Sequence, residues 1–157
     1  MIARIVVANQ AEARFYDAAG IASPLRAVGQ LENPDARLHD RDLKSDRPGR
    51  VFTSAAAGSG RRGAVAHHAT GGEKRPRQQV ATVFARRIAA ELSAAKQGRQ
   101  FDRLVLIVAP SFLGTLRKAL PKSLQSDVVA EIAKDLQDPS DAEVREHLPG
   151  LVFQTVP

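Results

Sequence analysis

The chain of 157 residues contains no cysteine and no tryptophan, and it has one tyrosine and six phenylalanines. The lack of cysteine excludes disulfide bonds, cysteine nucleophiles and thiolate metal sites. The scarcity of aromatic residues leaves few side chains that can stack on bases or sugars. We therefore expect any contact with a nucleic acid to run from arginine to phosphate and to follow shape rather than base sequence.

Long hydrophobic runs are also absent. No stretch of about 18 apolar residues occurs, so no segment is expected to insert into a membrane. The apolar run at the amino terminus, residues 5–8, is shorter than the core of a secretory signal, and no small-residue cleavage site follows it. We therefore expect a cytoplasmic protein.

The composition is that of a globular domain, with 43% hydrophobic and 25% charged residues. These fractions exclude wholesale disorder, collagen and membrane classes. The length suits one domain with a sizeable core, so we expect a single α/β domain over residues 1–157.

The net charge of +6 is concentrated in the middle of the chain. Residues 26–87 hold thirteen basic and six acidic side chains, whereas residues 1–25 are balanced and residues 88–157 have a net charge of −1. A charge confined to one segment can attract an anionic partner, although a solvated, flexible loop explains it equally well.

Residues 45–78 are rich in Gly, Ser, Ala, Arg and Pro and hold few large apolar side chains. Such a segment buries too little surface to offset its ordering entropy, which predicts a basic, flexible loop inserted in the domain. Long loops of this kind are usually functional or disordered. The candidate anion-binding or nucleic-acid-binding residues in this stretch are Arg47, Arg50, Arg61, Arg62, Gly71, Gly72, Lys74, Arg75 and Arg77.

Two short patterns support that choice. Residues 46–50 place the guanidinium groups of Arg47 and Arg50 around a turn, where they can hold phosphate or carboxylate with paired hydrogen bonds. The glycine pair Gly71-Gly72 permits positive φ and close approach of a partner to the backbone. A flexible hinge before a helix is the alternative interpretation of that pair.

The first third of the chain predicts strands. Residues 2–8 are short and β-branched, residues 13–16 form a second apolar run, and residues 25–31 alternate as a half-buried strand does. Asn33-Pro34 ends the third run. Residues 79–95 then show helical apolar spacing, and Gly98 is expected to end that helix.

The remaining third alternates strands and helices. Residues 104–109 form a near-continuous apolar run, typical of a central strand buried on both faces, and Pro110 suits the first turn of a helix. Residues 128–136 favour a strand, although helical spacing also fits them. Ser140 opens a short helix through a capping box. The order predicts an α/β fold with a mixed β-sheet flanked by helices.

No catalytic or metal-binding pattern stands out. His67 and His68 are adjacent and would point to opposite faces of a strand, so they do not chelate one metal easily. Asp135 and Asp138 are interpreted as helix caps rather than as catalysts. Nucleophile elbows, phosphate-binding loops and dinucleotide fingerprints are missing. We therefore expect no metal and no cofactor, and we favour a binding protein over an enzyme.

Several segments, in order, resemble the bacterial family called "protein required for attachment to host cells". The resemblance covers residues 2–148, and the segments that carry it are residues 5–8, 13–16, 45–50, 104–117 and 131–136. That family is similar to the middle domain of archaeal and eukaryotic class I peptide-chain release factors, which implies an RNase H-like sheet. In that domain a Gly-Gly-Gln loop precedes a long helix and enters the ribosome. This chain has Gly71-Gly72-Glu73 at the matching position, with a negative charge in place of the glutamine.

Three functions follow as hypotheses. The first is binding of the ribosome or another structured RNA through the basic loop. The second is an adhesion-related or regulatory role in which the loop binds another protein or an anionic surface polymer. The third is an RNase H-like hydrolase, which needs clustered carboxylates for two metal ions, whereas the first strands offer only Glu12 and Asp17.

Overall fold

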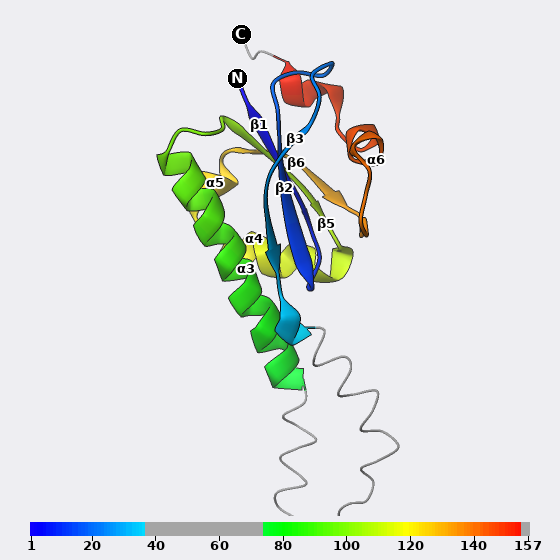
Figure 1. The fold of residues 1–157 in the computed structure, drawn as a ribbon. Helices are drawn as coiled ribbons and strands as arrows, with labels where there is room; N and C mark the ends of the chain where they lie inside the picture. Colours follow the sequence, from blue (N-terminus) through cyan, green and yellow to red (C-terminus); the bar gives the residue numbers. More distant parts are fainter. Residues whose placement is uncertain (37–73, 155–157) are drawn as a thin grey trace, which may run out of the picture.

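Five strands form one mixed sheet in the order β3-β2-β1-β5-β6 (Figure 1). The computed structural model describes residues 1–36 and 74–154. The antiparallel part of the sheet joins β1 to β2 and β2 to β3, and the parallel part joins β1 to β5 and β5 to β6. The predicted α/β fold with a mixed sheet is thus confirmed. The strands are β1 (Ala3–Ala8), β2 (Glu12–Ala18), β3 (Arg26–Glu32), β5 (Arg103–Val108) and β6 (Val128–Ala133).

The two central strands are the most buried. Every residue of β1 is buried, and in β5 all residues after Arg103 are buried. A strand that is covered on both faces needs apolar side chains at successive positions, which is the pattern that predicted residues 104–109 as central. Arg4 is the exception in β1, since it is a charged residue at a buried position.

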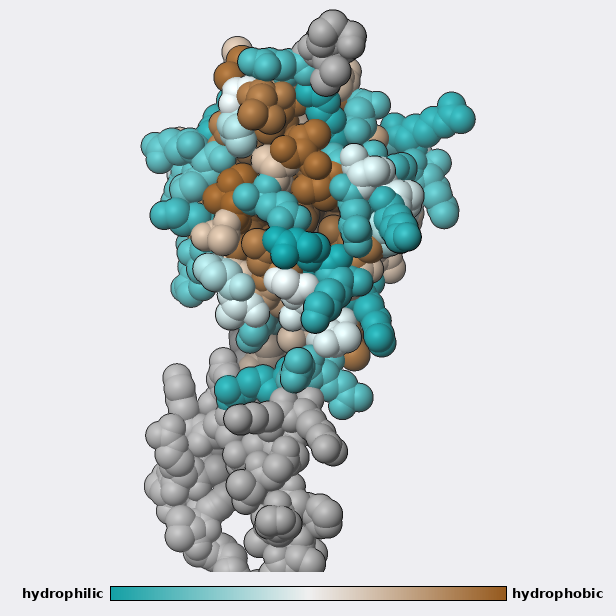
Figure 2. Space-filling view, turned by 180° about the vertical axis from the view of Figure 1, so that it is seen from behind, coloured by the Kyte–Doolittle hydropathy of each residue, from teal (hydrophilic) through white to brown (hydrophobic). Residues whose placement is uncertain are grey.

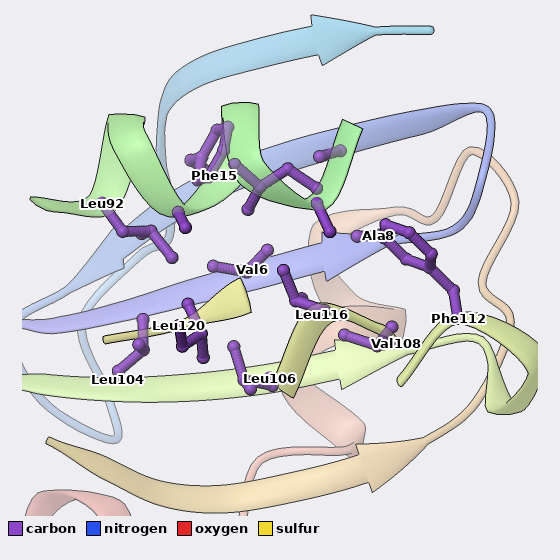
Figure 3. Close-up of a cluster of buried hydrophobic side chains, with 14 of the residues drawn as sticks. Val6, Ala8, Phe15, Leu92, Leu104, Leu106, Val108, Phe112, Leu116 and Leu120 are labelled. Carbon is purple, nitrogen blue, oxygen red and sulfur yellow. The ribbon is translucent and has the colours of Figure 1, made fainter. Parts of the chain in front are cut away.

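One face of the sheet is covered by α3 (Lys74–Gln97), α4 (Pro110–Ala119) and the short α5 (Lys122–Gln125). Figure 3 shows side chains of β1 and β5 meeting Leu92 of α3 and Leu116 of α4. The rings of Phe84 in α3 and Phe112 in α4 stack with centroids 6.0 Å apart. Within residues 1–36 and 74–154, no helix is long and apolar enough to cross a membrane.

The other face carries smaller elements, α6 (Asp141–Glu146) and the 3₁₀ helix η1 (Gly150–Phe153). Val144 and Val152 from these elements are fully buried against Ile5 and Ile107 of the central strands. The predicted cap of α6 is confirmed, because the Glu143 N–H donates to Ser140 Oγ at 3.1 Å.

The predicted half-burial of residues 25–31 is wrong. Leu25 is buried just before β3, but within the strand every residue except the half-buried Leu31 is exposed. β3 lies at the edge of the sheet, and Leu31 is its one residue packed against either core cluster. The alternation was present in the sequence, but at this edge only Leu31 contributes to a core cluster.

The start of α3 differs from the prediction, whereas its end agrees. The helix begins at Lys74, so residues 74–78 of the predicted loop are helical. Its last residue is Gln97, so the expectation that Gly98 ends the helix is confirmed. The left-handed residue that follows is Arg99, with φ of 55°, at a position that is usually glycine.

The buried charge of Arg4 is neutralised by Asp17 on the neighbouring strand. Arg4 Nε lies 2.5 Å from Asp17 Oδ1 and Nη2 lies 3.0 Å from Oδ2, and the two side chains are 6% exposed. The Arg4 guanidinium also lies 5.2 Å from the centroid of the Phe101 ring. Two parallel hydrogen bonds of this kind fix geometry as well as charge, so the pair sets β1 against β2.

We expect Asp17→Asn to lower the free energy of unfolding by about 3–5 kcal/mol, because it leaves the Arg4 charge buried without a counter-ion. The double variant Arg4→Met/Asp17→Leu removes both charges and should recover most of that loss. Urea unfolding followed by circular dichroism measures both. A loss below about 1 kcal/mol, the range of exposed pairs such as Arg117–Glu131, would contradict the prediction.

Candidate nucleic-acid interface

The carboxyl ends of the parallel strands and the start of α3 lie at the same end of the sheet. β1, β5 and β6 end there, and β3, which is antiparallel to β2, ends there as well. The described chain stops at Ala36, shortly after β3, and resumes at Lys74 with the first turn of α3, at the same end of the molecule (Figure 1). In open α/β sheets the carboxyl ends of the strands are the usual place for ligands.

Two asparagines hold this end together. Asn9 Oδ1 accepts the N–H groups of Ala11 and Glu12 at 2.8 and 3.0 Å, which closes the turn between β1 and β2. Asn33 is 6% exposed, and its Nδ2 donates to Gln10 O at 2.9 Å. Asn33 therefore ties the end of β3 to that turn, and it fixes the point at which the chain leaves the sheet.

The acidic residues of the connection after β6 are bound within the domain. Asn9 Nδ2 donates to Asp135 Oδ1 at 3.3 Å, and Arg14 Nη1 lies 2.9 Å from Asp138 Oδ1. The hydrogen bond to Asp138 is the main cause that raises the pKa of Arg14 above its ordinary value. The interpretation of Asp135 and Asp138 as helix caps is therefore wrong, since both aspartates pair with residues of the β1–β2 hairpin.

The surplus of positive charge in the described structure lies on the first half of α3. Residues 74–90 contain five basic residues and no acidic one. The buried face of this stretch comprises Ala81, Phe84, Ala85, Ile88 and Ala89, which turns Arg86 and Arg87 toward solvent. Arg77 is in line with the buried face, one turn before Ala81, and is exposed in the first turn of the helix. Exposed cations of this kind are the side chains by which proteins contact a phosphate backbone.

The neighbouring arginines of this surface have different roles. Arg87 Nη1 donates to Glu32 O at 3.0 Å, and the guanidinium lies 5.5 Å from the centroid of the Phe84 ring. Arg87 thus joins α3 to the end of β3. Arg86 is exposed and forms no hydrogen bond or ion pair with any residue that the structure describes, which leaves its charge available to a partner.

The structure places only part of the predicted site. Lys74, Arg75 and Arg77 lie in the first turn of α3, and Arg77 is exposed. Arg47, Arg50, Arg61, Arg62, Gly71 and Gly72 lie outside the described residues and stay predictions. Arg86 and Arg87 were missing from the predicted set, although the helical spacing of residues 79–95 already placed them on the polar face.

Within residues 1–36 and 74–154, the histidines, aspartates and glutamates form no group of three or more that is suited to a metal ion. Glu12 and Asp17 lie at odd spacing on β2, so they point to opposite faces of the sheet, and Asp17 is already paired with Arg4.

A family model described as "protein required for attachment to host cells" matches residues 4–148, which include β1 from Arg4 onward, the other described strands and α3 to α6. No curated protein matches the chain.

Substitution of Arg87 should lower the stability of the protein more than substitution of Arg86. Arg87→Ala removes a hydrogen bond and a cation–π contact, so we expect it to lower the free energy of unfolding by about 1–2 kcal/mol. Arg86→Ala removes no contact within the described structure and should stay within about 0.5 kcal/mol of the parent. Thermal unfolding of both variants tests this, and equal losses would contradict the assignment.

Proposed function

Because the chain belongs to the family of proteins required for attachment to host cells, we propose that it acts within that role by binding structured RNA, such as that of the ribosome. The binding surface in this proposal is the basic first half of α3 together with the basic stretch that precedes it. Residues 37–90 hold twelve basic and four acidic side chains, so an anionic partner is attracted to this part of the chain.

The observation that carries the proposal is the charge of α3 between Lys74 and Ala90. Its exposed cations have no carboxylate within the same stretch of helix, and Arg86 has no partner among the described residues. The phosphate groups of a nucleic-acid backbone suit these exposed cations, and the few aromatic residues suit contact by shape rather than by base.

The resemblance to release factors favours RNA over other polyanions. α3 begins at Lys74, directly after Gly71-Gly72-Glu73 in the sequence, which is the order of tripeptide and long helix in the middle domain of those factors. Glu73 stands where those factors have glutamine, so peptidyl-tRNA hydrolysis is not part of the proposal.

A protein partner is the second candidate, and a separate surface favours it. Figure 2 shows apolar surface gathered on the side opposite the view of Figure 1. Exposed apolar side chains include Val129 of β6 and Leu151 of η1, and Ile132, Leu136 and Phe153 are only partly buried. Exposed apolar surface on one side of a protein is typical of contacts between proteins.

Charge reversal tests the RNA proposal. We expect Arg86→Glu to weaken binding of a fluorescent ribosomal RNA hairpin by about fivefold or more at low salt. The salt slope should fall by about 0.9 for each phosphate that the variant no longer neutralises. The matched control is Lys118→Glu, which makes the same change at an exposed position of α4 and should bind like the parent. Fluorescence anisotropy over a salt series measures both.

Two outcomes would contradict the proposal. One is equal weakening by Arg86→Glu and Lys118→Glu, which would indicate diffuse attraction without a surface on α3. The other is failure of the parent protein to bind the hairpin or to sediment with ribosomes at low salt. In the second case, adhesion of a deletion strain complemented with Val129→Asp would test the protein-partner candidate.

A further inference from the structure

The outer edge of β6 is paired with no described strand. β6 comes last in the order of the sheet and pairs with β5, to which it is parallel. Lys134 donates its N–H to Val108 O at 3.0 Å, so the backbone groups of Lys134 point toward β5. Because backbone groups alternate in direction along a strand, those of Ile132 also point toward β5, whereas those of Glu131 and Ala133 point away from the sheet.

The side chains of β6 do little to protect this edge. Edge strands usually carry charged residues or proline, which prevent pairing with another chain. β6 has the sequence Val-Val-Ala-Glu-Ile-Ala, and its one charge, Glu131, is bound to Arg117 of α4 by hydrogen bonds of 2.6 and 3.3 Å. By contrast, β3 at the opposite edge begins with Arg26 and ends with Glu32. The edge of β6 is therefore the one suited to pairing.

Apolar side chains lie on both faces of the sheet beside the open edge. Ile132 packs in part against the core on the face that carries α6 and η1. Val128 packs in part against the core on the face that carries α3 and α4. A further strand along the edge would remove the exposed parts of such side chains from water, which favours association.

We propose that β6 pairs with β6 of a second copy of this chain, antiparallel and around a two-fold axis at Ile132. In this register Glu131 of each copy lies opposite Ala133 of the other, so the outward backbone groups of both residues are hydrogen-bonded. The two Ile132 side chains meet at the axis in a non-hydrogen-bonded pair, where side chains approach most closely. The contact is closed, because a two-fold axis pairs one surface with itself.

The charge of Glu131 selects this register over its neighbours. An axis at Glu131 would place two carboxylates directly opposite each other, which destabilises a strand pair. An axis at Ala133 would place Glu131 opposite Asp135, again a pair of like charges. An axis nearer the start of β6 would run into the register shift that precedes Ala130. The axis at Ile132 leaves Glu131 with Arg117 and opposite a methyl group.

Sedimentation velocity of the full-length protein over a concentration series tests the association. We expect a species of twice the 16.9 kDa mass of one chain. Ala133→Glu places a second carboxylate opposite Glu131 and should weaken the dimer by at least about tenfold. Ala133→Lys changes the same exposed position to the opposite charge and should dimerise at least as well as the parent. Circular dichroism checks that both variants are folded.

Two outcomes of that series would overturn the proposal. One is a parent protein that stays monomeric at every concentration, which would leave the edge for an extended segment of another protein. The other is a dimer that both variants weaken equally, or that neither weakens, because such a dimer does not place Ala133 opposite Glu131. The interface stands whether or not the protein binds RNA.

Disulfide formation tests the position of the axis. The chain has no cysteine, so Ile132→Cys introduces a single thiol. The Cα atoms of a non-hydrogen-bonded pair lie about 4.5 Å apart, within the range of a disulfide, so mild oxidation should give a covalent dimer on a non-reducing gel. Val129→Cys is the control, since its two copies would be six residues out of register, about 20 Å apart. Equal cross-linking of both variants would contradict the proposed register.

Discussion

The packing of α3 across the sheet determines where the other features of the molecule lie. Ala85, Ile88 and Leu92 of this helix are buried against the central strands, which fixes the rotation of the helix about its axis. Because that rotation is fixed, Arg86 faces solvent and Ala94 borders a small pocket beside β3. The cationic first half of α3 and the small residues of its second half thus lie on two different surfaces of the protein. The packing of the helix on the central strands fixes the position of both.

A second constraint comes from the central strand that α3 covers. β1 is buried along its whole length, and its single charged residue is tolerated because Asp17 lies beside it with two hydrogen bonds. This pair differs from the exposed pair Arg117–Glu131, since the removal of one partner leaves a charge in a medium that cannot solvate it.

The charged side chains near the two ends of α3 differ in sign and in pairing. At the carboxyl end of the parallel strands, Asp135 and Asp138 are paired with Asn9 and Arg14, so their charges are partly offset within the domain. In the first half of α3, Arg86 forms no hydrogen bond or ion pair with a described residue. The pocket beside β3, near the other end, is lined by the exposed carboxylate of Glu91.

Local sequence patterns determined much of the fold. The apolar run of residues 104–109, the proline at the start of α4 and the capping box at Ser140 each act within a few residues, and each prediction is confirmed. The basic character of residues 74–77 was also evident from the sequence, whereas the part of the predicted site before Lys74 stays a prediction. Tertiary structure alone decided the exposure of β3, the pairing of Arg4 with Asp17 and the binding of Asp138 by Arg14. Burial and ion pairing depend on which distant segment covers a residue, and residue spacing along the chain does not carry that information.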